Sequence, residues 1–199
     1  MAPGDARKQL LDDAIDHVAH HGLTDLSLRG LAAELGTSHR MLSHHFGSKE
    51  GLWVAIIREV EQRNRAAISE VTAAPDATLA DAMRSWWRHI SDPSLWPNER
   101  LFFEVYVQAL LGRPPTSELL DGIVDSWLDP AAEAAEAMGV PPGEARAFAR
   151  LGVAVTRGLL LDLLATKDRA GVDAAMEQWI AGFEGRFSGP TAARVDPAG

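Results

Sequence analysis

Apolar residues recur along the chain at intervals of three and four residues, which is the spacing of an amphipathic helix. No alternation of apolar and polar positions, the pattern of a half-buried strand, persists anywhere in the 199 residues. The sequence therefore predicts an all-α protein of about nine helices.

The first three predicted helices are separated by glycine. The first helix ends at Gly22, in the position after a helix that glycine favours. Ser27 and Ser38 can cap the second and third helices, because a serine hydroxyl accepts a hydrogen bond from a free N–H of the first turn. Gly36 is expected to end the second helix, and Gly47 the third.

Six further helices are predicted after this point. Ser48 is placed to cap the first of them, which should reach about Val71, before the Ala-Ala-Pro-Asp break at 73–76. The predicted ranges are 49–71, 78–90, 98–111, 117–138, 141–166 and 170–187.

Local signals set several of these bounds. Thr78 and Asp81 have the spacing of a capping box. Trp96-Pro97 is expected to break the chain before the helix at 98, because proline lacks an N–H. Pro130 is expected to kink the helix at 117–138.

The composition excludes several kinds of site. The chain has no cysteine, which excludes disulfides and thiolate metal sites. Its N-terminus lacks the apolar run of a signal peptide. The most apolar stretch, 148–165, is interrupted by charged residues that a membrane span tolerates poorly. We expect a cytoplasmic protein with no membrane segment.

The formal net charge of −9 argues against a general nucleic-acid coat protein. It does not exclude binding to a specific DNA sequence through one patch, because charge acts locally. Six of the seven histidines lie at or before residue 45, whereas the acidic residues lie mainly further along the chain.

Residues 28–46 have the organisation of a helix-turn-helix. Ala32 is small enough for two helices to cross closely, and Gly36 can adopt the positive φ of a tight turn. This spacing is weak evidence when taken alone. Apolar side chains are placed to hold the helices together: Leu31, Leu35, Leu42 and Phe46.

The stretch 36–52, GTSHRMLSHHFGSKEGL, resembles the signature of the tetracycline-repressor (TetR) family of transcriptional regulators. In that family the recognition helix ends in Leu, an aromatic residue, two further residues and Phe. A short turn then leads to Ser-Lys-Glu-x-Leu. This chain has the matching residues in register: Leu42, His44, His45, Phe46, Ser48, Lys49, Glu50 and Leu52.

The resemblance implies a division of the chain into two domains. Residues 1–48 would form a helix-turn-helix DNA-binding domain, and residues 49–188 a helical domain for ligand binding and dimerisation. The tail at 189–199 is rich in Pro, Ala and Gly, and we expect it to be disordered.

The resemblance also implies which residues contact DNA. The third helix would lie in the major groove, and the starts of the second and fourth helices would contact phosphate. The residues at the matching positions are Ser27, Arg29, Ser38, His39, Arg40, Met41, Ser43, His44 and Lys49. Arg40 is best suited to bind guanine through a bidentate contact.

Two positions depart from the family pattern. Ser43 stands where the family commonly has Tyr, and Arg40 where it has a small residue. An aromatic phosphate contact is lost and a long cation is gained, so the family's base preference does not carry over. Of His44 and His45 only one can face DNA, and the other is expected to pack beside Phe46.

Two other kinds of site have weaker support. His17, His20 and His21 lie at positions i, i+3 and i+4 of the first helix, a spacing that can hold a metal ion. No second ligand pair recurs, so we expect no metal and no other cofactor. The sequence also lacks a Gly-rich phosphate loop and a nucleophile elbow, so we do not expect an enzyme.

The middle helices are rich in aromatic residues, which suit a pocket for a small apolar or aromatic effector. The candidate lining residues are Trp87, Trp96, Phe103, Tyr106 and Trp127. The alternative for each of them is that it fills the core.

Helix 141–166 is apolar on more than one face, which requires burial on both sides. In the resembled family the last two long helices pair with the same helices of a second copy. The resemblance therefore implies a homodimer formed through 141–166 and 170–187. A central helix buried within a monomer is the alternative, and Trp179, Phe183 and Phe187 would suit either an interface or a core.

Taken together, these features predict a DNA-binding transcriptional regulator, a repressor that a small apolar ligand releases from a palindromic operator in double-stranded DNA. The alternative is a helical small-molecule-binding protein or enzyme whose helix-turn-helix no longer binds DNA. The missing aromatic residue at Ser43 is the one feature that favours this alternative.

Overall fold

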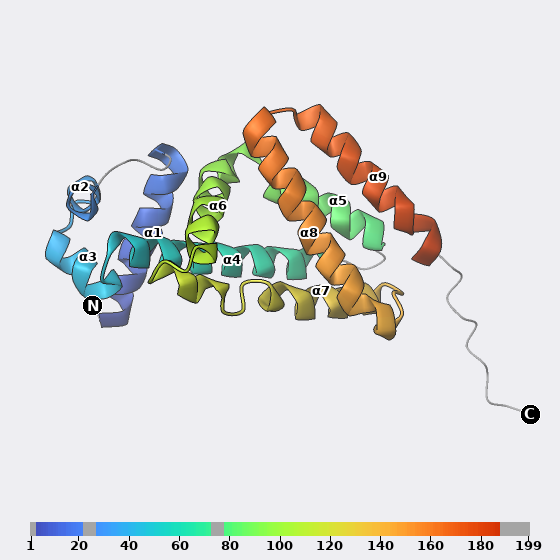
Figure 1. Cartoon of the computed structure of the whole chain (residues 1–199), viewed down its shortest axis with the longest axis horizontal. Coiled ribbons are helices and arrows are strands. Elements are labelled where there is room, and N and C mark those ends of the chain that lie inside the picture. The colour runs from blue at the N-terminus through green and yellow to red at the C-terminus, as the bar shows by residue number, and fades with distance from the viewer. Residues whose placement is uncertain (1–2, 22–26, 73–77, 188–199) are drawn as a thin grey trace, which may run out of the picture. The chain divides into compact units, whose positions relative to one another are not determined.

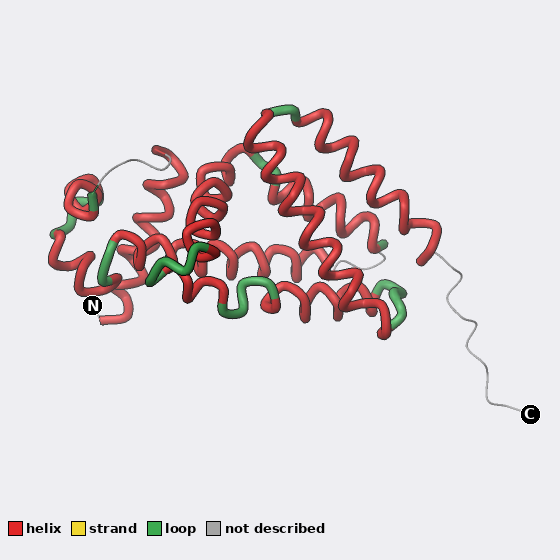
Figure 2. The backbone as a smooth tube through the Cα atoms, in the orientation of Figure 1, coloured by secondary structure: helices red, strands yellow, loops and turns green. Residues whose placement is uncertain are grey.

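The computed structural model describes residues 3–21, 27–72 and 78–187. These residues form nine α-helices and two short 3-10 helices joined by loops, with no strand among them (Figure 2). The helices are α1 (Pro3–His21), α2 (Leu28–Glu34), α3 (His39–Phe46), α4 (Lys49–Thr72), α5 (Leu79–Ile90), η1 (Pro93–Leu95), α6 (Trp96–Leu110), η2 (Thr116–Leu120), α7 (Asp125–Ala137), α8 (Pro142–Thr166) and α9 (Arg169–Phe187) (Figure 1). The predicted all-α fold is confirmed.

The described chain divides into two compact units. Unit 1 lies within residues 1–67 and 90–123, and unit 2 within residues 68–89 and 124–199. The predicted domain boundaries at 48 and 188 stay predictions. The predicted helix end at Gly22, the break at 73–76 and the tail at 189–199 lie outside the described residues.

Unit 1 is built around α1, α4 and α6. The predicted stripe of α1 is buried, including Ala14, Ile15 and Val18. Helix α1 packs against α6, which contributes the fully buried Leu101. Polar contacts also join α1 to α4, because Arg63 binds the carboxylate of Asp12.

Unit 2 is a bundle of α5, α7, α8 and α9. Helices α8 and α9 run antiparallel and side by side, joined by a short turn (Figure 1). The turn has Lys167 in the left-handed conformation, with its N–H bonded to the carbonyl of Leu163 at 2.9 Å. Helix α5 is held against α9 by the Trp87 indole, which donates to Asp173 at 2.6 Å.

The capping box at the start of α5 is confirmed. The hydroxyl of Thr78 accepts from the backbone N–H of Asp81 at 3.1 Å and donates to its carboxylate at 2.6 Å. This hydroxyl also lowers the pKa of Asp81. The helix therefore begins one residue after the threonine, as the spacing predicted.

Two predictions about helix breaks are wrong. Trp96-Pro97 does not interrupt the chain, because α6 begins at Trp96 and Pro97 lies in its first turn. A proline is tolerated there, since the N–H groups of a first turn have no partner within the helix.

The predicted helix at 117–138 is in fact η2 followed by α7. The chain turns between them, where Gly122 has a φ of +78°, a conformation that suits glycine. The signal for this break was the Asp121-Gly122 pair, which is typical of turns. Pro130 lies inside α7, which continues past it to Ala137.

Among the helices that the structure describes, none combines the length and the apolar character needed to cross a membrane.

Candidate nucleic-acid interface and ligand pocket

The joint between α2 and α3 has the geometry of a Schellman cap. Gly36 has a φ of +64°, and its N–H donates to the carbonyl of Ala33 at 3.1 Å. The next N–H, that of Thr37, donates to the carbonyl of Ala32 at 2.9 Å. This pair of bonds satisfies the last carbonyls of α2 and ends the helix. The prediction that Gly36 makes a tight turn is confirmed.

Serine hydroxyls begin both helices of this motif, as predicted. Ser27 accepts from the N–H of Gly30, and Ser38 from the N–H of Met41, each at 3.2 Å. Each hydroxyl also keeps its own proton, which can be donated to an acceptor such as a phosphate oxygen. Capping and DNA contact are therefore compatible roles for both residues.

Helix α3 has one buried face and one exposed face. Leu42 and Phe46 are buried and hold the helix against the rest of unit 1. Most of the predicted major-groove residues lie on the exposed side: His39, Arg40, Met41 and His44. Ser43 is half-buried, with its hydroxyl 3.4 Å from Nε2 of His39.

The two histidines at the end of α3 differ in their surroundings. His45 is half-buried, and its ring packs edge-on against Phe46 with the centroids 6.2 Å apart. His44 is exposed. The expectation that one histidine packs beside Phe46 is confirmed for His45, which leaves His44 available for a partner.

Two predicted phosphate contacts with a positive charge, Arg29 and Lys49, flank α3. Arg29 is exposed on the first turn of α2. Lys49, at the start of α4, has its ammonium nitrogen 5.7 Å from the centroid of the Trp53 ring. In the part of the chain that the structure describes, neither Arg29 nor Arg40 forms an ion pair with a carboxylate. Both guanidinium groups are therefore available to an anion.

The turn from α3 into α4 depends on a glycine that sequence reasoning missed. Ser48 caps α4 by accepting from the N–H of Gly51 at 3.0 Å. A Cβ at Gly51 would lie 2.2 Å from the carbonyl oxygen of Phe46, which is closer than real contacts allow. The absence of a side chain at Gly51 therefore lets the start of α4 approach the end of α3.

The histidines of α1 interact with one another. The rings of His17 and His21 are stacked with their centroids 4.4 Å apart. Nε2 of His17 is buried without a hydrogen-bond partner, and this burial, followed by the nearby His21, lowers the pKa of His17. Across the described residues, no group of three or more His, Asp or Glu is arranged to hold a metal ion.

The five aromatic residues predicted to line a ligand pocket fall into both units. In unit 1, Tyr106 stacks on Phe102 at 5.4 Å, Phe103 packs edge-on against the same ring at 5.3 Å, and the Trp96 indole donates to the carbonyl of Ser91. In unit 2, the buried Trp127 packs against Trp86 at 5.3 Å, and Trp87 is buried beside Asp173. Their joint role in a pocket stays a prediction.

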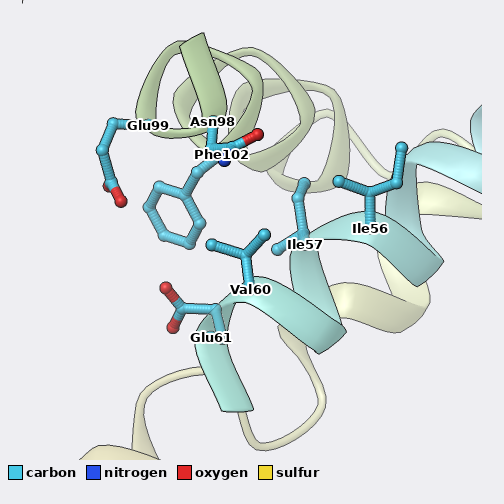
Figure 3. A pocket seen from close by; sticks show the side chains of 7 residues that line it. All are labelled: Ile56, Ile57, Val60, Glu61, Asn98, Glu99 and Phe102. Carbon is cyan, nitrogen blue, oxygen red and sulfur yellow. The ribbon is translucent and has the colours of Figure 1, made fainter. Parts of the chain in front are cut away.

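A pocket within unit 1 lies between α4 and α6 (Figure 3). Its volume is about 200 Å³, including the part open to solvent. Helix α4 contributes Ile56, Ile57, Val60 and Glu61, and helix α6 contributes Asn98, Glu99 and Phe102. Sequence reasoning did not find this site. The sequence signal for this site was the apolar stripe of α4. After Val60 this stripe is followed by the polar residues Glu61 and Asn64, both of which are buried.

Comparison with known proteins supports the assignment of the N-terminal motif. Residues 10–56, which include α2, α3 and the start of α4, match the family described as bacterial regulatory proteins, tetR family. This part of the chain therefore has the sequence features of that family. The predicted resemblance is confirmed.

Curated relatives match the same end of the chain. The HTH-type transcriptional regulator BetI of Klebsiella pneumoniae is 29% identical over 80 residues, which are 40% of this chain and 41% of BetI. The HTH-type transcriptional repressor AcnR of Corynebacterium glutamicum is 35% identical over 68 residues, which are 34% of this chain and 36% of AcnR. The chain thus matches about two fifths of the length of these relatives.

Solved structures resemble this chain over most of its length. A transcriptional regulator from Rhodococcus sp. Rha1 has a TM-score of 0.72 at 22% identity, and the match covers 90% of this chain and 96% of that one. The multidrug binding protein EbrR, complexed with imidazole, has a TM-score of 0.59 at 26% identity and 88% coverage of both chains.

Proposed function

We propose that this chain is a ligand-responsive transcriptional regulator that acts in the cytoplasm as a homodimer on a palindromic operator. The proposal rests on the exposed face of α3, which lies within the residues that match the tetR family. This face carries the exposed cation Arg40. Two further cations, Arg29 and Lys49, lie at the starts of the neighbouring helices α2 and α4. Phosphate contacts from the flanking residues would position α3 in the major groove, where side chains reach the base edges.

Dimerisation is supported by the exposed faces of α8 and α9. Small and apolar residues follow one another at helical spacing along the solvent side of α8: Ala147, Leu151, Ala154, Gly158, Leu161 and Ala165. Leu151 and Leu161 are 53% and 52% exposed, so this stripe presents two large apolar side chains to solvent. A second copy would bury this stripe. Two α3 helices related by a two-fold axis require half-sites about one DNA turn apart, roughly 34–36 Å, or a multiple of it.

Ligand control is supported by the fold and by the pocket beside α4. Helix α4 carries Lys49 at one end and the pocket residues from Ile56 to Glu61 further along. A ligand that binds one position of α4 more tightly than another would shift the protein toward that position. The change in DNA affinity is limited by the ligand's difference in affinity for the two positions. EbrR, whose fold is similar, binds imidazole. We propose that the effector has an apolar or aromatic body and that its binding releases a repressor from the operator.

The test is selection of genomic DNA fragments by the purified protein, followed by sequencing of the bound fraction. The proposal expects enrichment of a palindromic or near-palindromic sequence. Binding of all fragments alike, or of none, would contradict it. The second result would favour the alternative, a helical small-molecule-binding protein or enzyme whose helix-turn-helix no longer binds DNA, for which Ser43 is the available hint.

A further inference from the structure

Arg7 of α1 lies over the ring of Phe46, the last residue of α3. The central carbon of its guanidinium group is 5.2 Å from the ring centroid, which is the geometry of a cation–π contact. Figure 1 shows the start of α1 beside the end of α3. Arg7 precedes the stretch 10–56 that matches the tetR family, so that match assigns it no role.

The hydrogen-bond donors of Arg7 have no acceptor within the described parts of the chain. There the guanidinium forms neither a hydrogen bond nor an ion pair, and the side chain is exposed. The Phe46 ring holds the charge but offers no oxygen acceptor to the five N–H groups. The neighbouring Lys8 differs, because its ammonium group binds the carboxylate of Asp12 at 2.8 Å. Arg7 is therefore held in place by Phe46 and still able to bind an anion.

Lys49, the predicted phosphate contact at the start of α4, makes the same kind of contact with Trp53. Both rings belong to buried residues, Phe46 and Trp53, so each gives its cation a fixed support. The two supports are close in the fold, since Gly51 of α4 approaches the Phe46 carbonyl so closely that a Cβ would not fit. Two supported cations and the positive end of the α4 dipole therefore gather where α3 meets α4.

This arrangement suits a phosphate of the DNA backbone. Arg and Lys side chains and helix starts bind phosphate oxygens, and such contacts fix the register of the protein without reading a base. Helix α1 can hold Arg7 firmly, because Ala14 and Val18 are buried and Asp12 binds Arg63 of α4. A cation on so fixed a helix loses little freedom when it binds.

We infer that Arg7 binds a DNA phosphate near the one bound by Lys49, so that α1 helps to position α3 in the major groove. The inference rests on the proposed function, because it adds a contact to the proposed DNA interface. The contact is independent of base sequence, and it should therefore strengthen binding to every duplex and increase the dependence of binding on salt.

The experiment compares wild type with Arg7→Met, Arg7→Lys and Lys8→Met. Methionine keeps a long apolar side chain over the Phe46 ring and removes the charge, whereas lysine keeps the charge. Lys8→Met is the matched control, because it removes one positive charge from the same part of α1, where Lys8 is 69% exposed and paired with Asp12. Fluorescence anisotropy measures the affinity for the selected genomic fragment and for a scrambled duplex of equal length over a range of salt concentrations.

Arg7→Met should lower the affinity for both duplexes by about tenfold per bound protomer at about 0.1 M salt. The slope of log affinity against log salt should fall by about one unit per bound protomer. Arg7→Lys should restore most of this slope, because a phosphate contact requires a positive charge. Lys8→Met should keep the slope of the wild type.

A purely structural role for Arg7 predicts a different result. If Arg7 only covers Phe46, Arg7→Met and Arg7→Lys would change the free energy of unfolding in urea and leave the salt slope unchanged, which would overturn the inference. An equal fall in slope for Arg7→Met and Lys8→Met would also overturn it, because the effect would then come from net charge. A wild type that binds neither duplex would refute the proposed function together with the inference, whereas a wild type that binds DNA with the same slope as Arg7→Met would refute the inference alone.

Discussion

At the scale of single residues, the candidate DNA-contact residues have different chemical roles. Arg40 is a planar, permanently charged fork on the exposed face of α3, which suits the two acceptors of guanine in the major groove. Lys49 is a point charge at the start of α4, beside the free N–H groups of the first turn, which suits a phosphate. Because the two roles differ, mutation of Arg40 and mutation of Lys49 should lower the affinity for DNA in different ways.

Arg40→Ala should lower affinity for the selected operator by about 1–3 kcal/mol per half-site and relax discrimination at one base pair. Lys49→Ala should lower affinity for all DNA alike and reduce the slope of log affinity against log salt by about one unit. Both are measured by fluorescence anisotropy with operator and scrambled duplexes over a range of salt concentrations. If Arg40→Ala weakens binding to both duplexes equally, Arg40 contacts phosphate and not a base.

His17 gives the folded protein a dependence on pH. Burial lowers the pKa of His17 below the ordinary value of 6.5, so the unfolded chain binds the proton more readily. The stability that this neutral histidine contributes is complete above about pH 6.5 and falls as the pH falls toward the lowered folded-state pKa.

His17→Gln should therefore reduce the loss of stability below pH 6.5. The measurement is urea unfolding of wild type and variant at equal protein concentration between pH 5 and 8. The difference in free energy of unfolding between the two proteins should change with pH below about 6.5 and be constant above it. A constant difference over the whole range would show that His17 does not contribute to the pH dependence.

At the scale of elements, α4 is the helix of unit 1 that contacts α1 and α3 and also lines the pocket. Its first turn meets the end of α3 at Gly51, and its middle lines the pocket. Further along, Arg63 pairs with Asp12 of α1 and with Glu59 on its own helix at 3.0 Å. The pairing with Lys8 and Arg63 lowers the pKa of Asp12. A displacement of α4 would therefore be felt at α1, at α3 and in the pocket.

Gly51→Ala tests the joint between α3 and α4. The new methyl group would lie 2.2 Å from the Phe46 carbonyl oxygen, a backbone atom that cannot move without moving the helix. We expect a loss of about 1–3 kcal/mol in the free energy of unfolding, together with weaker operator binding, because the recognition helix is displaced.

Gly143→Ala is the control for this prediction. Gly143 also lies in a helix, but a Cβ there meets nothing within 4 Å. Alanine should be neutral or stabilise by up to about 1 kcal/mol, because it restricts the unfolded chain. Equal stability changes in the two variants, measured by urea unfolding, would show that the close approach at Gly51 is not tight in solution.

At the scale of the whole molecule, the proposed dimer depends on the solvent sides of α8 and α9. The sequence left open whether the aromatic residues of α9 form an interface or the core of the protomer. Phe183 is buried in unit 2 and packs edge-on against Phe148 at 4.9 Å, so it belongs to the core of the protomer. Trp179 is half-buried beside Phe148. The side chain of Phe187 lies outside the described residues.

Leu161→Glu should separate the dimer without unfolding the protomer. The leucine is exposed in the single chain, so the charge is tolerated there, whereas a dimer would bury it without a partner. We expect light scattering to show monomers at micromolar concentration, circular dichroism to stay helical, and affinity for the palindromic operator to fall. Val107→Glu is the control, since Val107 is 53% exposed on α6 of unit 1. A wild type that is already monomeric, or a dimeric Leu161→Glu, would contradict the model.

Local structure and the resemblance to a known family could both be read from the amino-acid sequence. Helix starts and ends follow from neighbouring residues, as at Ser27, Gly36 and Ser38, because a cap involves only the adjacent turn. The helix-turn-helix was recognisable for the same reason, since its residues are contiguous. Pattern reasoning was wrong where a turn signal was overlooked, at Asp121-Gly122, and where a first-turn proline was taken for a break, at Pro97.

Contacts between side chains on different helices could not be read from the sequence, because they depend on how the helices pack. The pocket of Glu61, Asn98 and Glu99 joins positions almost forty residues apart, and no spacing rule relates α4 to α6. The close approach of Gly51 to Phe46, the packing of His45 rather than His44 against Phe46, and the core position of Phe183 are likewise products of packing. Periodicity identifies a face that must be covered, but the partner that covers it depends on how the helices are arranged in space.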